Sequence, residues 1–226
     1  MPDAPDPDLL AAWTALLRRC GAADDPEPAG RELLRRWAEP QRRYHSTGHL
    51  RAVLAHVDAL AGHADDPDAV RLAAWFHDAV YRPDRSENEE RSAVLAVRAL
   101  AGAGLPAARV DEVARLVRLT VTHHPGPGDR DGEVLCDADL AVLGGTPEAY
   151  AAYAAAVREE YAFVPEPDFR AGRAAVLRRL LALPALYRTP TARERFDAPA
   201  RANLTAELAQ LAQLAEPTGA SGPTGA

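Results

Sequence analysis

The amino-acid sequence predicts an all-α protein, and two observations support this prediction. Apolar residues recur at steps of three and four in most segments, as one face of an amphipathic helix requires. No stretch shows the alternation of apolar and polar residues that is typical of a half-buried strand. The 226 residues fit the size of one domain, so we expect a single helical bundle over 1–215 and a disordered tail over 216–226.

Composition limits the classes of partner and compartment. The formal net charge of -7 argues against binding to a nucleic-acid polymer, because phosphate backbones select basic surfaces. The N-terminus lacks the basic and apolar regions of a signal peptide, and no apolar run reaches membrane-spanning length. Cys20 and Cys136 stand far apart and match no metal-ligand spacing. We therefore expect a reduced, cytoplasmic protein with no membrane partner.

Local signals place the first three helices. Apolar side chains at helical spacing predict a helix over 8–19, which Gly21 ends. A second helix stops at Pro40, because proline lacks the amide donor and clashes in a helix interior. Ser46 is the expected N-cap of a third helix. The inward face of that helix would carry Leu50, Val53, Leu54, Val57 and Leu60.

The later helices follow from the same patterns. Ser86 and Glu89 form a capping-box pattern that predicts a helix running through Leu100. The other expected helices cover residues 67–81, 106–119, 134–144, 147–162, 168–183 and 197–214. The helix over 147–162 should have a buried face formed by Tyr150, Tyr153, Val157 and Tyr161. The helix over 168–183 should have one formed by Val176, Leu177, Leu180 and Leu181.

The adjacent pair His77-Asp78 interrupts the apolar run 72–81 and is the strongest chemical signal in the chain. Burying an unpaired ionised carboxylate costs several kcal/mol. A bound metal cation would compensate for this cost, and a nitrogen-oxygen ligand pair suits a divalent first-row metal. The pair therefore predicts a metal site whose other ligands come from elsewhere in the chain.

Other histidines and aspartates have the right helical setting to contribute. His49 falls in the first turn of its helix, with His45 in the loop before it. His49, His56 and His63 are seven residues apart, about 10.5 Å per step along a helix, so they cannot share one metal. We expect the side chains of His56, His63 and His124 to be solvated.

Asp137 and Asp139 lie in a short apolar helix, two residues apart. Side chains at that spacing point to nearly opposite faces of a helix, so only one can readily face a given metal. The residues alone leave the choice between them open.

The order His, His-Asp, Asp resembles the HD-domain superfamily, and in particular a bacterial branch of predicted metal-dependent HD phosphohydrolases. The resemblance covers roughly residues 42–183. The matching segments are Tyr44-His45-x3-His49, Trp75-Phe76-His77-Asp78-x-Val80-Tyr81, Asn88-Glu89-x2-Ser92-Ala93 and Asp137-Ala138-Asp139-Leu140-x2-Leu143-Gly144.

The resemblance implies an HD-type bundle with the metal between central helices. Its ligands would be His49, His77, Asp78 and Asp139, with Asp137 as the reserve for the last position. HD proteins with two metals usually have two further, separated histidines before the last aspartate. This chain has only the adjacent His123 and His124 there, which favours one divalent ion, drawn from Mn, Co, Ni, Zn, Mg or Fe.

The implied activity is hydrolysis of a small phosphorylated molecule, a nucleotide or related phosphoester, by a metal-activated water. His45 or His123 would transfer a proton to the leaving group, and Glu89 would orient a ligand or water. The arginines that flank the ligand segments would stabilise charge on the phosphoryl oxygens; they are Arg42, Arg43, Arg82 and Arg85.

Structural and functional alternatives stay open at this point. His77 and Asp78 could be a neutral histidine and a hydrogen-bonded buried aspartate, and Asp139 a helix-capping or surface acid. The function could be that of a non-catalytic module that binds a metal or a nucleotide. An iron-dependent oxygenase is disfavoured by the missing second pair of separated histidines, and the sequence leaves open whether the chain forms a homodimer.

Overall fold

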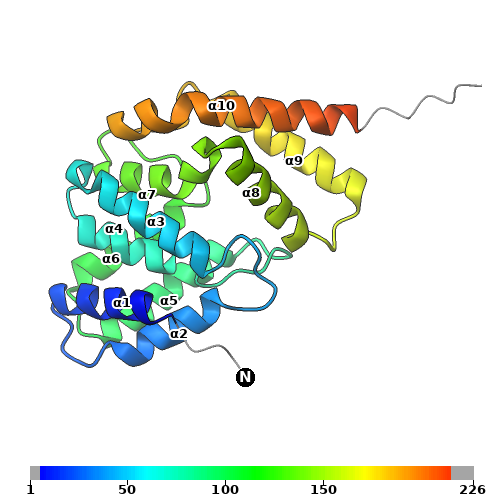
Figure 1. Cartoon of the computed structure of the whole chain (residues 1–226). Helices are drawn as coiled ribbons and strands as arrows, with labels where there is room; N and C mark the ends of the chain where they lie inside the picture. The colour runs from blue at the N-terminus through cyan, green and yellow to red at the C-terminus, as the bar shows by residue number, and fades with distance from the viewer. Residues whose placement is uncertain (1–5, 215–226) are drawn as a thin grey trace, which may run out of the picture.

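The computed structural model describes residues 6–214, and this part of the chain contains helices and no strand (Figure 1). The all-α prediction is confirmed, whereas the predicted tail 216–226 lies outside the described residues. The helices are α1 (Pro7–Arg19), α2 (Glu27–Trp37), α3 (Thr47–Leu60), α4 (Pro67–Phe76), α5 (Asn88–Gly102), α6 (Ala107–Leu119), α7 (Arg130–Leu140), α8 (Pro147–Glu160), α9 (Glu166–Leu181) and α10 (Pro190–Gln213), with single 3-10 turns at η1 (Ala61–His63) and η2 (Ala141–Gly144).

Helix α4 lies in the core: Ala69, Val70 and the run Leu72–Phe76 are buried, whereas Asp68 and Arg71 are partly exposed and ion-paired. It packs against α3, α6 and α7, so its last residue points into the middle of the bundle. Trp37 from α2 is fully buried beside this end and donates its indole N–H to the carbonyl of Trp75 at 3.0 Å. Buried packing and the Trp37 hydrogen bond therefore fix the position of the C-terminus of α4.

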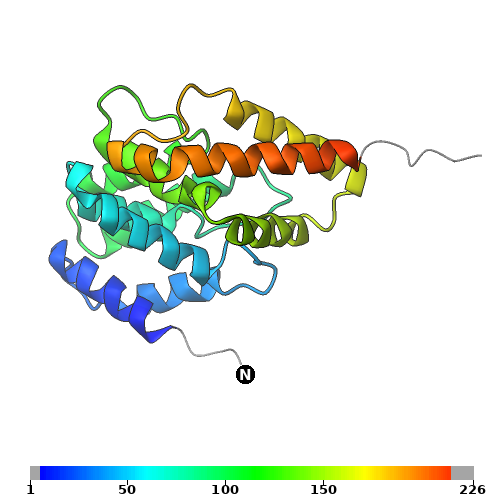
Figure 2. The ribbon, with the colours of Figure 1, turned by 45° about the horizontal axis from the view of Figure 1, so that its top comes forward.

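The helices are arranged from α1 and α2 at one end of the bundle to α10 at the other, with α3, α4 and α7 between them (Figure 1). The turned view shows α10 running across the face of the molecule, with α9 along its C-terminal half (Figure 2). None of the helices in residues 6–214 has both the length and the apolar character needed to cross a membrane.

The predicted helix over 67–81 is too long, because α4 ends at Phe76 and the chain then turns. Its continuation is held by side chains instead of helical hydrogen bonds. Ser92 Oγ accepts from the backbone N–H of Val80 at 3.0 Å, and Tyr81 donates its hydroxyl to Glu160 at 3.0 Å. Because α4 ends at Phe76, Asp78 lies in a turn and not on the helix.

One predicted cap is absent, and the other is in place but makes no side-chain bond. The capping box at Ser86 is absent: α5 begins at Asn88, and the side chain of Asn88 bonds to the backbone of Arg82. Ser46 occupies the N-cap position of α3, but its side chain makes no capping bond. Glu160 bonds to the loop before α3, and Asn88 bonds to the loop before α5, so contacts other than the predicted caps hold both starts.

The C-terminal helices also differ from the prediction. Helix α10 begins at Pro190 rather than near Asp197, because Thr189 caps it by accepting the N–H of Ala192, and Pro199 is accommodated inside it. On α9, Leu177 is buried as expected, but Val176 is 38% exposed and is not part of a buried stripe.

Candidate metal centre

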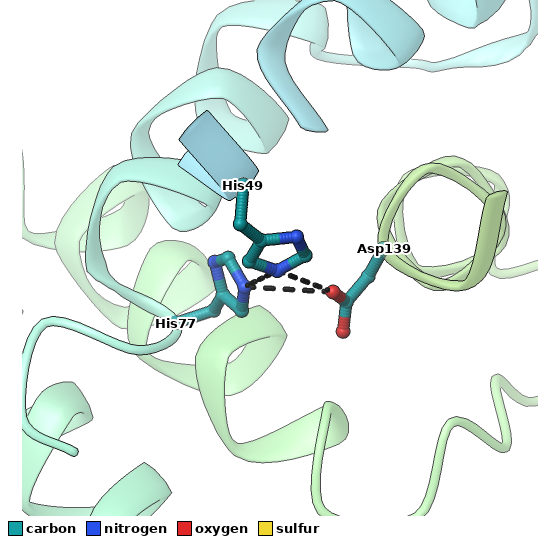
Figure 3. A group of neighbouring side chains, drawn as sticks. All are labelled: His49, His77 and Asp139. Atoms are coloured by element: carbon teal, nitrogen blue, oxygen red, sulfur yellow. Dashed lines mark hydrogen bonds and ion pairs between the residues drawn. The ribbon is translucent and has the colours of Figure 1, made fainter. Parts of the chain in front are cut away.

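Three side chains from different helices meet in the core: His49 from α3, His77 from the end of α4 and Asp139 from α7 (Figure 3). The Nε2 atoms of the two histidines are 3.2 Å apart. Asp139 Oδ1 lies 3.1 Å from His49 Nε2 and 3.5 Å from His77 Nε2. Both histidines are buried, and the group could hold a metal ion.

The hydrogen bonding of His77 directs its ligand atom into this group. Nδ1 donates to the carbonyl of Ala74 at 2.8 Å, so Nε2 is the atom left to face His49 and Asp139. Ligands bound about 2.1 Å from one ion lie roughly 3.0 to 3.4 Å apart at adjacent positions. Two of the three separations fall in that range and the third, 3.5 Å, is slightly longer. The donor set of two nitrogens and one oxygen fits a divalent cation.

Asp78 lies near the same nitrogen of His77. Its Oδ2 is 3.3 Å from His77 Nε2 and 4.0 Å from His49 Nε2, and its side chain is 14% exposed. The backbone carbonyl of Asp78 accepts from the guanidinium of Arg42 at 2.8 Å, which fixes the turn after α4. The carboxylate is thus within reach of an ion held by the two histidines.

The charges of this cluster are strongly coupled. Burial would lower the pKa of His77, but the carboxylates of Asp78 and Asp139 raise it well above its ordinary value. Burial would raise the pKa of Asp139 and of Asp78, but His77 above all lowers both. Burial chiefly lowers the pKa of His49. The carboxylates of Asp78 and Asp139 are each 14% exposed and held ionised, which makes the position favourable for a cation.

His123 supports Asp139 from behind. Its Nε2 donates to Asp139 Oδ2 at 2.7 Å, which leaves Oδ1 directed at the two histidines. Among residues 6–214, His123 is the one non-glycine residue with a positive φ, 50°. Left-handed backbone is costly for such a residue and is kept where surrounding contacts require it. The predicted proton donor therefore lies at the site, but bonded to a ligand side chain.

His45 lies at the opposite edge and is oriented by Glu160, a residue that the sequence analysis missed. An ionised carboxylate can only accept, so His45 Nδ1 donates to Glu160 Oε2, at 2.6 Å. The ring's Nε2 faces the cluster, 4.0 Å from Asp78 Oδ2. His45 is thus held with one nitrogen free toward the site.

Glu160 is the anchor of the whole loop before α3. Its Oε1 accepts the backbone N–H groups of Arg43, Tyr44 and His45, at 2.8 to 3.0 Å. Burial raises its pKa, but the contacts with His45 and these N–H groups lower it to about 2. Nothing in the sequence marks this residue, because it follows Glu159 at the end of an ordinary amphipathic helix.

Asp137 has a different role from Asp139. It is fully buried and accepts the backbone N–H groups of Arg188 and Thr189, at 2.8 and 2.7 Å. It thereby anchors the segment that leads into α10. The expected divergence of the two aspartates is present, and Asp139 is the one that lies in the cluster.

The four predicted phosphate-binding arginines have different surroundings. Arg42 is buried, and its guanidinium bonds to the backbone carbonyls of His45, Asp78 and Ala79, which leaves it little capacity for a ligand. Arg43 is exposed and lines a cavity next to the cluster. Arg82 and Arg85 are exposed and border a separate hollow with Glu87 and Arg91.

The remaining predicted residues lie further from the centre. Glu89 is half-buried, and no hydrogen bond in residues 6–214 joins it to the cluster. His124 is exposed, as expected. His63 is only half-buried and bonds to Glu133 at 2.6 Å, and half-buried His56 lies edge-on to Phe196.

A cavity of about 660 Å³ opens beside the cluster. His49 and Asp139 form part of its wall, and the rest comes from α3, η2, α8 and α10. Eight of the 21 lining residues are alanine or valine, namely Ala52, Val53, Ala138, Ala141, Val142, Ala149, Ala152 and Ala156. Its size suits a small organic molecule.

No protein-family model matches this chain, and no curated protein or solved structure is significantly similar to it. The resemblance to the HD superfamily therefore stays a prediction based on the four sequence segments. The metal-competent cluster is an independent observation from the structure.

Proposed function

We propose that this chain is a divalent-metal-dependent phosphohydrolase that acts on a small phosphorylated molecule. The observation that carries the proposal is the meeting of His49, His77 and Asp139 at the wall of a cavity of about 660 Å³. A bound divalent ion would supply a Lewis acid for a phosphoryl oxygen and a water of lowered pKa. The motif resemblance to HD phosphohydrolases supports the same reaction.

Asp78 completes the proposed ligand set. Adjacent positions on an octahedral ion are about 3 Å apart and opposite ones about 4.2 Å. Asp78 Oδ2 lies 3.3 Å from one histidine Nε2 and 4.0 Å from the other. Asp78 is outside the group of donor atoms that all lie within 4.8 Å of one another, so its carboxylate would move toward the ion to bind it. His49, His77, Asp78 and Asp139 would then hold one ion and leave room for water and substrate.

His45 is the proposed proton-transfer group. Glu160 fixes the proton on Nδ1, so Nε2 can accept a proton from water or, when protonated, give one to the leaving oxygen. His123 is less suited to this step, since its Nε2 is bonded to Asp139. Arg42 acts as a positioning residue, because it ties the carbonyl of His45 to that of Asp78.

The test starts with elemental analysis of the purified protein. A panel of phosphomonoesters and nucleotides follows, with Mn, Co, Ni, Mg or Zn added. We expect turnover of at least one ester, loss of turnover with a chelator, and loss in His77→Ala but not in Asp84→Ala, a change in an exposed loop acid.

Two results would contradict the proposal. Tight binding of a phosphoester without turnover by the metal-loaded protein would favour a non-catalytic binding module. Bound iron together with oxygen uptake would favour the oxygenase alternative.

A further inference from the structure

The cavity extends well beyond the proposed metal ligands. His49 and His56 lie on the same face of α3, and both line it. Seven residues separate them, which is about 10.5 Å along a helix. The cavity therefore has one end at the cluster and another two helical turns away.

The far end has one guanidinium and one imidazole. Arg195 from α10 lies close enough to His56 to lower the pKa of His56, an effect second to that of burial. No ion pair to Arg195 occurs in the described part of the chain. The guanidinium stacks over Phe196 at 5.0 Å, and the His56 ring meets the edge of the same side chain at 5.4 Å. A guanidinium and an imidazole thus lie at one aromatic ring, and no carboxylate in residues 6–214 pairs with the guanidinium.

Gly144 explains how α10 comes near enough to form this end. A Cβ at Gly144 would lie 2.6 Å from Phe196 Cβ and 2.8 Å from its Cα. Asn203 on α10 also donates to the carbonyls of Leu143 and Gly145, at 2.9 and 3.0 Å. The close packing of η2 against α10 is therefore specific, and it sets Arg195 over the cavity.

The wall between the two ends is apolar and made of small side chains, mainly alanines of α3 and α8. Such a wall offers van der Waals contact to a hydrocarbon or a flat ring and few hydrogen bonds. A ligand that fits this cavity would have an apolar middle and an anionic group at each end.

We propose that His56 and Arg195 bind a second oxyanion of the substrate, a carboxylate or a phosphate about 10 Å from the phosphate at the metal centre. This inference rests on the proposed function, because it places the scissile phosphate at the metal. It narrows the substrate class to elongated phosphoesters with an apolar middle and a charged far end.

The experiment measures binding rather than turnover. Isothermal titration calorimetry with the manganese-loaded full chain would compare octylphosphonate, 8-phosphonooctanoate and 1,8-octanediphosphonate, which differ only in their far end. We expect the form with the preferred far oxyanion to bind roughly tenfold tighter than octylphosphonate. The two charged probes distinguish carboxylate from phosphate.

Variants then assign the effect to residues. Arg195→Gln should bring the ratio of the charged and uncharged affinities toward one, His56→Gln should reduce it, and Arg195→Lys should restore part of it. Arg179→Gln is the matched control, since Arg179 is an exposed arginine of α9. It should leave the ratio as in the wild type.

Equal affinities of all three probes for the wild type would overturn the second site and leave the proposed function intact. A preference that survives Arg195→Gln would also overturn it. Failure of all probes to bind the metal-loaded protein would overturn the inference together with phosphate binding at the metal. Absence of ester turnover, in contrast, would contradict only the hydrolase proposal.

Discussion

Single residues decide the chemistry of the centre, and the most informative of them is Asp78. Asp78 follows His77, whose Nε2 lies near the donor atoms of His49 and Asp139. Because α4 ends at Phe76, the Asp78 side chain is not fixed to a helix face and reaches to 3.3 Å from His77 Nε2. Its carboxylate is held ionised mainly by His77, and His45 adds to this effect. A metal ion bound to His77 Nε2 would take over that role.

Asp78→Ala should therefore weaken metal binding at least tenfold, while the far-ultraviolet circular dichroism stays that of the wild type. Elemental analysis after dialysis measures the loss. Asp84→Ala, in the exposed loop, serves as control and should retain the metal. Full metal content in the Asp78 variant would remove this residue from the ligand set.

The Glu160 carboxylate provides a pH test. Its pKa of about 2 lies below its ordinary value of 4.5, so the ionised form stabilises the fold at pH values above 4.5. This stability is lost as the pH falls toward 2 and amounts to about 3 kcal/mol. Glu160→Gln should unfold more readily in urea at pH 6 than the wild type, and this difference should shrink at pH 3. A difference independent of pH would contradict the assignment.

At the scale of elements, the site depends on where helices stop and how closely they approach. The sequence predicted most helices from their periodicity, because an amphipathic stripe is a local property. It misplaced the end of α4 and the start of α10, where Ser92, Glu160 and Asp137 from other segments hold the chain. Such contacts leave no local pattern.

The same distinction applies to the candidate site. His49, His77 and Asp139 were predicted because metal ligands are few in kind and their order resembles a known family. The roles of Glu160, which binds the loop before α3, and of Arg42, which binds backbone carbonyls, could not be predicted. Each depends on contacts between segments that are distant in the sequence.

Gly144 tests the close approach of η2 and α10. An added Cβ would meet backbone atoms of Phe196, which cannot rotate away. Gly144→Ala should lower the free energy of unfolding by about 1 to 3 kcal/mol, measured by urea denaturation. Gly172→Ala, on α9 with open space around it, should be neutral or slightly stabilising. Equal stability of the Gly144 variant and wild type would contradict the tight contact.

For the whole molecule, the centre joins the neighbouring helices α3 and α4 to α7, which lies more than fifty residues later in the chain. An ion bound by α3, the end of α4 and α7 would bind the folded state and not the unfolded one. At a free metal concentration one hundred times the dissociation constant, this adds about 2.7 kcal/mol of stability. Chelation should therefore lower the melting temperature of the wild type, with no comparable change in Asp139→Ala. An unchanged melting temperature on chelation would argue against a metal in the core.

The buried Trp37 gives the centre an optical reporter. Its ring centroid lies 5.4 Å from that of His77 and 6.2 Å from that of His49, and the chain has three tryptophans in all. A paramagnetic ion such as Mn or Co at the centre would quench emission from this indole, whereas Mg or Zn would leave it bright. Titration in a fluorimeter would then follow occupancy without any substrate.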